Sequence, residues 1–274
     1  MEQVKILAIS DFHGKMPKIL QEDKDFDVVM TAGDFCDSEK IRKEIFKHWQ
    51  ERQKWFEIVG EKKAQKIGMD AIKSGEKTVK RLSLLAGKRQ IYGIPGNLDF
   101  RPRKSSRWKI HKKDFYTKYT YKIKNYKDIN LKRMKFLDFE LIGYGEQSFP
   151  EKMISNRLFK KKYSKMDKLF SSAKKKAKQT ILLCHNPPHG YLDKVRMKES
   201  PEYGNHLGSQ VVAAIIQKYH PFLVICGHMH ENQGIAMMAR TTIVNCGEAG
   251  KGNYAVIMLK NAKCSVKLRR GRKK

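Results

Sequence analysis

Two polar motifs at opposite ends of the 274-residue chain constrain its fold most strongly. Asp11-Phe12-His13 follows an apolar run at residues 4–9, and Gly227-His228-Met229-His230 follows another at residues 222–226. Short apolar runs of this kind indicate buried strands, and a sharp turn after a strand places side chains at one edge of a sheet. Both motifs can offer donor atoms to one metal ion or to two adjacent ions. One domain must therefore hold both ends of the chain.

Three more turns of this type lie between the two motifs, each at the end of an apolar run: Gly33-Asp34, Gly96-Asn97 and Cys184-His185. The five turns supply seven candidate metal ligands: Asp11, His13, Asp34, Asn97, His185, His228 and His230. Carboxylate, carboxamide and imidazole donors together suit Mn, Fe, Zn, Ni or Co, and manganese is the metal we favour. A site for two divalent ions needs about this many ligands and one bridging carboxylate. Asp34 is the natural bridge, because the preceding glycine lets the backbone approach closely.

The order of these motifs resembles that of the calcineurin-like metallophosphoesterases, whose pattern is D-x-H, G-D, G-N, a single His and G-H-x-H. The resemblance extends over about residues 5–257. A closer similarity is to the predicted phosphoesterases related to cyclic-nucleotide phosphodiesterases. It rests on three segments, residues 185–190 (HNPPHG), 204–209 (GNHLGS) and 245–247 (NCG).

This resemblance implies an α/β fold, a two-sheet β-sandwich flanked by helices in four αββα layers. It also implies a metal-dependent phosphoric ester hydrolase, in which a metal-bridging hydroxide attacks phosphorus in line. One ion would be held by Asp11, His13, Asp34 and His230, and the other by Asp34, Asn97, His185 and His228.

The sequence departs from the family pattern at position 98. Many members carry a histidine there that is thought to protonate the leaving oxygen, whereas this chain has Leu98. Asp99 remains a candidate catalytic residue, although it has lost the neighbour that it would orient. His206, in a glycine-flanked loop, is the candidate replacement for the acid. Binding of a phosphate oxygen, or simple packing, would explain His206 equally well.

The favoured function is a phosphodiesterase acting on cyclic nucleotides or nucleic acid. A diester with an activated leaving group depends less on a proton donor at position 98 than an alkyl monoester does. The segment after Asp34 also lacks the arginine of protein Ser/Thr phosphatases, which argues against phosphoprotein substrates. Two alternatives stay open: a phosphomonoesterase on small metabolites, and a polyanion-binding module with a weakly active metal site.

The net charge of +30, from 58 Lys and Arg against 28 Asp and Glu, favours a polyanionic partner. A lysine-rich proteome or a heat-adapted surface would give the same bias. Residues 100–135 interleave cations with aromatic rings, as a single-stranded nucleic acid channel would. The alternative for this segment is a loop whose rings pack on the body of the protein.

The chain is expected to form a single metallophosphoesterase domain over residues 1–262 and a basic C-terminal tail over 263–274. A helical insertion at about 38–86, with glycines at 60, 68 and 75 as candidate breaks, could cap the site, mediate a homodimer or merely pack. Antiparallel strands are expected within 118–145. The remaining expected strands are 4–10, 27–32, 90–94, 180–184, 222–226, 241–245 and 254–259, and the remaining helices are 15–22, 152–178 and 209–219.

Composition also bears on location. No apolar run approaches the 18 or more residues of a membrane span, and the first strand begins too early for a signal peptide. The five cysteines are dispersed without CxxC spacing. Such a set is expected in a reducing compartment, so we predict a cytoplasmic protein with no membrane partner.

Overall fold

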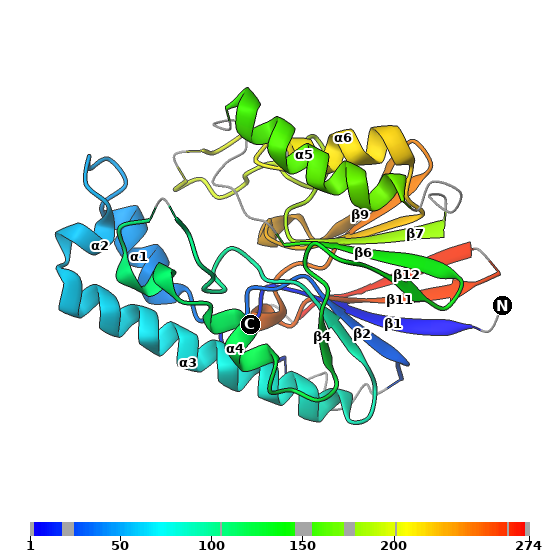
Figure 1. Cartoon of the computed structure of the whole chain (residues 1–274), viewed down its shortest axis with the longest axis horizontal. Coiled ribbons are helices and arrows are strands. Elements are labelled where there is room, and N and C mark those ends of the chain that lie inside the picture. The colour runs from blue at the N-terminus through cyan, green and yellow to red at the C-terminus, as the bar shows by residue number, and fades with distance from the viewer. Residues whose placement is uncertain are drawn as a thin grey trace.

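Two six-stranded sheets pack face to face, with helices on both outer faces (Figure 1), in a computed structural model that describes residues 3–17, 25–104, 106–145, 155–172, 179–200, 202–261 and 263–271. The first sheet has the order β12 (Lys263–Arg269), β11 (Tyr254–Lys260), β1 (Val4–Ile9), β2 (Val28–Thr31), β3 (Ile91–Gly93) and β4 (Tyr126–Asp128). The second has the order β5 (Arg133–Phe136), β6 (Phe139–Tyr144), β7 (Thr180–Cys184), β8 (Leu223–Cys226), β10 (Thr241–Asn245) and β9 (Gly234–Met238). This architecture confirms the predicted α/β sandwich.

Successive side chains of the central strands point to opposite faces, as the two-residue period of a strand requires. In β1, Ile6 packs into the core between the sheets, whereas Leu7 packs under the helices of the first sheet. In β8, Ile225 enters the same central core and Val224 the layer beneath the helices of the second sheet. Strands buried on both faces therefore appear in the sequence as continuous apolar runs.

The strands that precede the polar turns run in the same direction within each sheet. β1, β2, β3 and β4 are parallel neighbours, as are β6, β7, β8 and β10. Their carboxyl ends consequently meet at one edge of the sandwich, where ligands of open α/β sheets bind. This topology brings together turns that are more than 200 residues apart in the chain.

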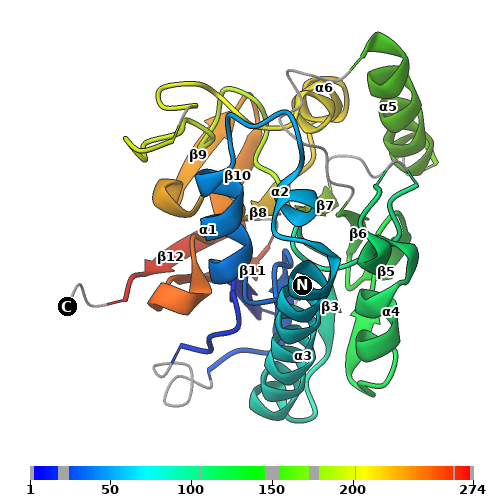
Figure 2. The ribbon, with the colours of Figure 1, turned by 90° about the vertical axis from the view of Figure 1, so that its left-hand side faces the viewer.

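The helices form the outer layers and one end of the molecule (Figures 1 and 2). They are α1 (Glu39–Lys47), α2 (Trp55–Ile58), α3 (Glu61–Ala86), α4 (Phe115–Thr120), α5 (Asn156–Ser171) and α6 (Gln210–Tyr219), with short 3-10 turns η2 (Lys109–Lys112), η5 (His230–Asn232) and η6 (Ala249–Lys251). The expected breaks at Gly68 and Gly75 are wrong, because α3 continues through both. A Cβ at Gly68 would lie 2.8 Å from the Trp108 ring, so close packing explains this glycine.

Two expected segments differ from the structure. Residues 118–120 belong to α4, β4 pairs in parallel with β3, and only β5 and β6 form an antiparallel pair within the described residues of 118–145. The tail expected from residue 263 is instead the edge strand β12, which pairs with β11 over its whole length. Alternate residues Cys264, Val266 and Leu268 pack against the core, so this basic segment has the two-residue apolar alternation of a strand.

Parts of the expected helices lie outside the described residues, namely residues 18–22, 152–154 and 173–178, as do tail residues 272–274. Residues 15–17 are described and are not helical. Ser209 caps α6 as expected, since its hydroxyl accepts from the backbone N–H of Val212 at 3.1 Å. None of the helices in the described ranges is both long and apolar enough to cross a membrane.

Candidate metal centre

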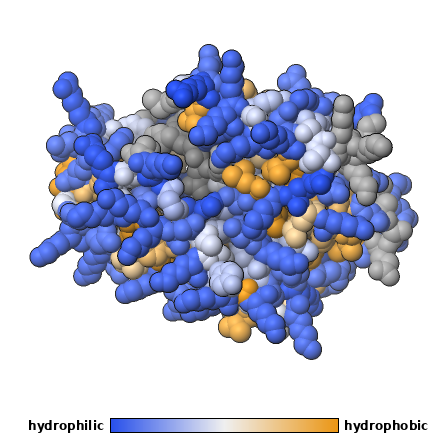
Figure 3. All heavy atoms as spheres, viewed as in Figure 1, coloured by the Kyte–Doolittle hydropathy of each residue, from blue (hydrophilic) through white to orange (hydrophobic). Residues whose placement is uncertain are grey.

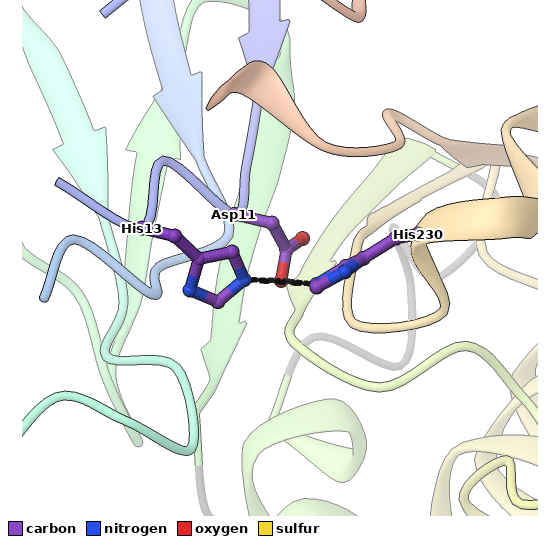
Figure 4. Close-up of side chains that lie close together, drawn as sticks. All are labelled: Asp11, His13 and His230. Carbon is purple, nitrogen blue, oxygen red and sulfur yellow. Dashed lines mark hydrogen bonds and ion pairs between the residues drawn. The ribbon is translucent and has the colours of Figure 1, made fainter. Parts of the chain in front are cut away.

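The first and last polar turns meet at the carboxyl edge of the sandwich. Asp11 and His13 from the turn after β1 and His230 from the turn after β8 point toward one another (Figure 4). The Nε2 atoms of His13 and His230 lie 2.9 Å apart, and Oδ1 of Asp11 lies 3.1 Å from Nε2 of His230. Two imidazole nitrogens and a carboxylate oxygen thus converge on one small volume.

A second cluster adjoins the first. Oδ1 of Asn97 lies 2.8 Å from Nε2 of His185 and 3.0 Å from Nδ1 of His228. Oδ2 of Asp34 is 3.7 Å from Nε2 of His185, and a carboxylate oxygen of Asp11 lies within 4.8 Å of a donor atom of each of these residues. The structure therefore brings all seven predicted side chains into one continuous group, with the two aspartates at its centre.

The backbone at this edge is held in a rarely populated conformation. Asp11, His13, Asp34 and His228 all have positive φ, between 46° and 67°. Left-handed backbone at non-glycine residues is unfavourable and tends to accumulate where a functional geometry is imposed. Gly96 permits this packing, because a Cβ there would overlap the carboxylate of Asp34. The small residue before the ligand is therefore a steric requirement.

Neighbouring groups fix which ring nitrogen faces the cluster. Nδ1 of His185 donates to the carbonyl of Ala32 at 2.7 Å, and Nδ1 of His13 lies 3.0 Å from the Ser38 hydroxyl. Each contact turns Nε2 of its ring toward the shared volume. Nδ1 of His230 likewise faces the buried carboxylate of Glu248 at 3.4 Å. Partners of this kind orient metal-binding histidines in proteins. Sequence reasoning missed Ser38 and Glu248, which no motif singles out.

Burial shapes the protonation of the cluster. It lowers the pKa of His13 and of His228 to about 3, so both rings stay neutral and keep a lone pair. Burial also raises the pKa of Asp34 well above its usual value, and the adjacent Asp11 carboxylate adds to this effect. Burial alone would raise the pKa of Asp11, but the charge and hydrogen bond of His230 hold it below its usual range. The metal-free cluster thus keeps His13 and His228 neutral, whereas the Asp11 carboxylate raises the pKa of the adjacent His230 against the effect of burial.

This donor set fits divalent cations. Two triads, Asp11 with His13 and His230, and Asp11 with Asp34 and His185, each place their donor atoms within 4.8 Å of one another. Asp11 and Asp34 are at most 1% exposed, and a bound cation would neutralise these buried carboxylates while accepting the imidazole lone pairs.

A family model described as "Metallophosphoesterase, calcineurin superfamily" matches residues 1–268. The chain belongs to this superfamily. Members use divalent metals to hydrolyse phosphoric esters, which agrees with the Asp and His groups described above.

Individual relatives of this metallophosphoesterase are distant. The protein MJ1162 of Methanocaldococcus jannaschii is 23% identical over 249 residues, covering 89% of this chain and 88% of its own. One crystal structure shares 20% identity at a TM-score of 0.68, over 99% of this chain and 100% of the other. TT1561 of Thermus thermophilus shares 13% identity at a TM-score of 0.54, over 97% and 99% of the two chains. At these identities, the solved structures establish the fold alone.

Asp99, the other candidate catalytic residue of this metallophosphoesterase, is buried among the ligand-bearing turns, where it can orient neighbouring groups. The side chain is 1% exposed, and its Oδ2 accepts from the backbone N–H groups of Asp34 and Gly96, both at 2.8 Å. Its Oδ1 accepts from the N–H of Phe35 at 2.9 Å and from the hydroxyl of Tyr119 at 3.2 Å. Four donors therefore occupy the carboxylate, which ties together two ligand-bearing turns.

The residue at position 98, Leu98, packs in apolar surroundings. Leu98 packs against the cluster formed by the insertion, and its backbone N–H donates to Oδ1 of Asp34 at 2.7 Å. The side chain at position 98 thus contacts an apolar cluster that includes Trp55 of α2 and Ile67 of α3.

The aromatic segment at 100–135 packs most of its rings on the body of the protein, which agrees with the packed-loop alternative and not with a base-stacking channel. Trp108 is 7% exposed and stacks on Phe56 of α2 with ring centroids 5.7 Å apart. The cation Arg107 pairs with Glu57, and Arg103 donates to the carbonyl of Asn97 at 2.7 Å. Burial of these rings and pairing of these cations make the segment a support for the Asn97 turn.

His206 lies in a second polar group, in which its Nδ1 is 2.5 Å from Oδ1 of the buried Asp193. Sequence reasoning missed Asp193.

A groove of about 1350 Å³ runs past His206 and His230, and the cations that line it are Arg42, Lys194, Arg196, Lys251 and Arg270. The face in Figure 3 is mostly hydrophilic, with apolar side chains in separate groups. Five cations therefore line the same groove as His230, one of the candidate metal ligands.

Proposed function

We propose that the protein is a dinuclear metal-dependent phosphodiesterase acting on cyclic nucleotides or nucleic acid. The observation that carries this proposal is the convergence of seven donor side chains, from five turns, at the carboxyl edge of both sheets. The proposed ligands are Asp11, His13, Asp34, Asn97, His185, His228 and His230, with Asp34 bridging. Asp34 lies beside Asp11 and His185, which are proposed ligands of the first and the second ion, and this supports Asp34 as the bridge.

The side chains of this centre would bind and orient the two ions, and the ions would supply the electrophile. Two divalent cations, when bound, would polarise the phosphoryl oxygens and lower the pKa of water. His13 and His185 each present Nε2 because their Nδ1 atoms are engaged elsewhere. Asp99 holds the turns at Asp34 and Gly96 at a fixed separation. This preorganisation avoids rearrangement when the substrate binds.

Two features support a diester. Leu98 can neither donate nor accept a proton, which disfavours substrates that depend on an acid at that position. The groove beyond His230 is lined by five cations and by the acids Asp193 and Glu231, which suits a substrate with flanking phosphates. We therefore propose that nucleic acid enters through this groove and not by stacking on residues 100–135.

The remaining assignments extend this proposal. Manganese is the proposed metal because mixed imidazole and carboxylate donors suit it. The five cysteines are free thiols, which supports a cytoplasmic site of action. The insertion exposes Phe46, Trp49 and Ile58, and a homodimer through these residues stays a prediction.

Hydrolysis of bis-p-nitrophenyl phosphate and of p-nitrophenyl phosphate, with and without manganese, tests the proposal. We expect manganese-dependent cleavage of the diester with little cleavage of the monoester. Asp34→Asn should abolish turnover and lower the metal content, whereas Asp37→Asn, at a loop residue whose carboxylate accepts from the N–H of Glu39, should change neither.

The opposite substrate preference would establish a phosphomonoesterase on small metabolites. If neither ester is cleaved and RNA or DNA binds with a steep salt dependence, the protein is instead a polyanion-binding module. Cleavage that persists after complete removal of metal would contradict the metal-dependent mechanism itself.

A further inference from the structure

Hydrolysis of a phosphodiester with a poor leaving group requires a proton for the departing oxygen, and position 98 cannot provide one. Leu98 is held in the apolar cluster of the insertion, together with Phe100 and Trp108. Asp99 is saturated by four donors and is 1% exposed. A proton donor for this site must therefore come from another wall of the groove.

His206 has the geometry of an oriented histidine. Its Nδ1 lies 2.5 Å from Oδ1 of Asp193, and no hydrogen bond from its Nε2 is found within the described residues. Asp193 is fully buried, and its Oδ2 accepts from the backbone N–H groups of Gly190 and Gly208 at 3.0 and 2.9 Å. The imidazole remains 43% exposed. A rigid carboxylate thus fixes one ring nitrogen and leaves the other for the groove.

Three contacts tether this histidine to the metal-ligand turn. His206 pairs with Lys194 across an isolated antiparallel bridge. The carbonyl of Lys194 accepts from Nδ2 of Asn232 at 2.7 Å, and the N–H of Arg196 donates to Oε1 of Glu231 at 3.1 Å. Glu231 and Asn232 follow directly after His230, and His206 and His230 line the same groove. The position of His206 is therefore set relative to the site.

The chain contains a close control in His189. This histidine is 44% exposed, its Nδ1 lies 3.6 Å from Oδ2 of Asp193, and its ring centroid is 5.9 Å from that of His206. The described residues that line the groove include His206 but not His189. The two histidines thus match in exposure and in their carboxylate neighbour, and differ in access to the site.

We propose that His206, oriented by Asp193, is the general acid that protonates the leaving oxygen. As the oxygen of water bonds to phosphorus and releases a proton to solvent, the phosphorus–oxygen ester bond breaks and its electron pair leaves with the departing oxygen. The proton on Nε2 of His206 passes to that oxygen, which leaves the ring neutral with its Nδ1 proton directed at Asp193. Solvent then returns a proton to Nε2. This inference rests on the proposed function.

The test is a series of diesters whose leaving groups range from p-nitrophenol to an alkyl alcohol, cleaved by the wild-type protein, by His206→Gln and by His189→Gln. General acid catalysis contributes about 10²–10⁴-fold, most for poor leaving groups. We expect His206→Gln to lose about this factor on alkyl diesters and less than about fivefold on the nitrophenyl diester. His189→Gln should match wild type on both.

Equal loss by His206→Gln on all esters, or no loss on any, would overturn the assignment. Asp193→Asn should show the same selective loss as His206→Gln, at unchanged manganese content. If it loses manganese and activity on every ester instead, the pair is structural and the assignment fails. A wild-type protein that cleaves no diester refutes the proposed function, whereas diester cleavage with an unaltered leaving-group dependence in His206→Gln refutes this inference alone.

Discussion

Replacement of Asp99 by asparagine should destabilise the fold by about 2–4 kcal/mol, although the two side chains have nearly the same shape. The carboxylate accepts from three backbone N–H groups and one hydroxyl, so all its acceptor positions are filled. Asparagine can keep its oxygen toward Asp34 and Gly96. Its amide N–H₂ then faces the buried N–H of Phe35, and two donors oppose one another.

The magnitude follows from three terms. An unsatisfied buried N–H costs about 1–3 kcal/mol, and loss of charge from the bonds to Asp34 and Gly96 costs about 1 kcal/mol each. Tyr119 can rotate its hydroxyl to accept, so it adds little. Burial raises the pKa of Asp99, because the charge is unfavourable in the interior, and a neutral side chain recovers part of that free energy. The penalties exceed this recovery by roughly 2–4 kcal/mol.

Urea unfolding in the presence of a chelator measures this free energy without a contribution from metal binding. Asp25→Asn is the control, because the Asp25 side chain is 75% exposed and should change stability by less than about 0.5 kcal/mol. In addition, Asp99→Asn should weaken manganese binding by about 10–100-fold, since Asp99 orients the Asp34 turn. A loss of stability under about 1 kcal/mol would refute the reasoning from donor saturation.

Two further predictions concern the stability of the metal-free protein at low pH and the close packing at Gly68. The pKa of His13 and of His228 is about 3 in the folded protein and 6.5 unfolded, so only the unfolded chain binds these protons as the pH falls from 6.5 toward 3. The metal-free protein should therefore lose stability over this window, by about 1.4 kcal/mol per pH unit for each of these two histidines. Asp34 and His230, whose pKa values are raised in the folded protein, offset part of this loss. Equal urea midpoints at pH 7 and pH 5 would contradict it. Gly68→Ala should lower the free energy of unfolding by about 1–2 kcal/mol, because its methyl group would meet the Trp108 ring 2.8 Å away. A stabilised variant, as helix propensity alone predicts, would show that the insertion packs differently.

The strands and the ligand-bearing turns can be predicted from the sequence because both are local. A strand buried on both faces must be apolar throughout, and the polar residue after it lies at the sheet edge whatever the rest of the chain does. The apolar runs at residues 180–184 and 222–226 are therefore enough to place His185 and His228 at that edge. The edge strand β12 (KCSVKLR) alternates apolar with polar or charged residues, so its basic composition hides the strand. The other unpredicted edge strand, β9 (GIAMM), is apolar but only five residues long.

The partners of each side chain are decided only by tertiary structure. Asp99 follows the Asn97 turn in sequence, yet its carboxylate bonds to backbone groups 64 and 65 residues away, and that converts a catalytic candidate into a structural one. Likewise, Asp193 is 13 residues from His206, and no periodic pattern links them. A sequence pattern reports which face of an element is apolar. Hydrogen-bond partners depend on how separate elements pack, and that is settled only when the whole chain has folded.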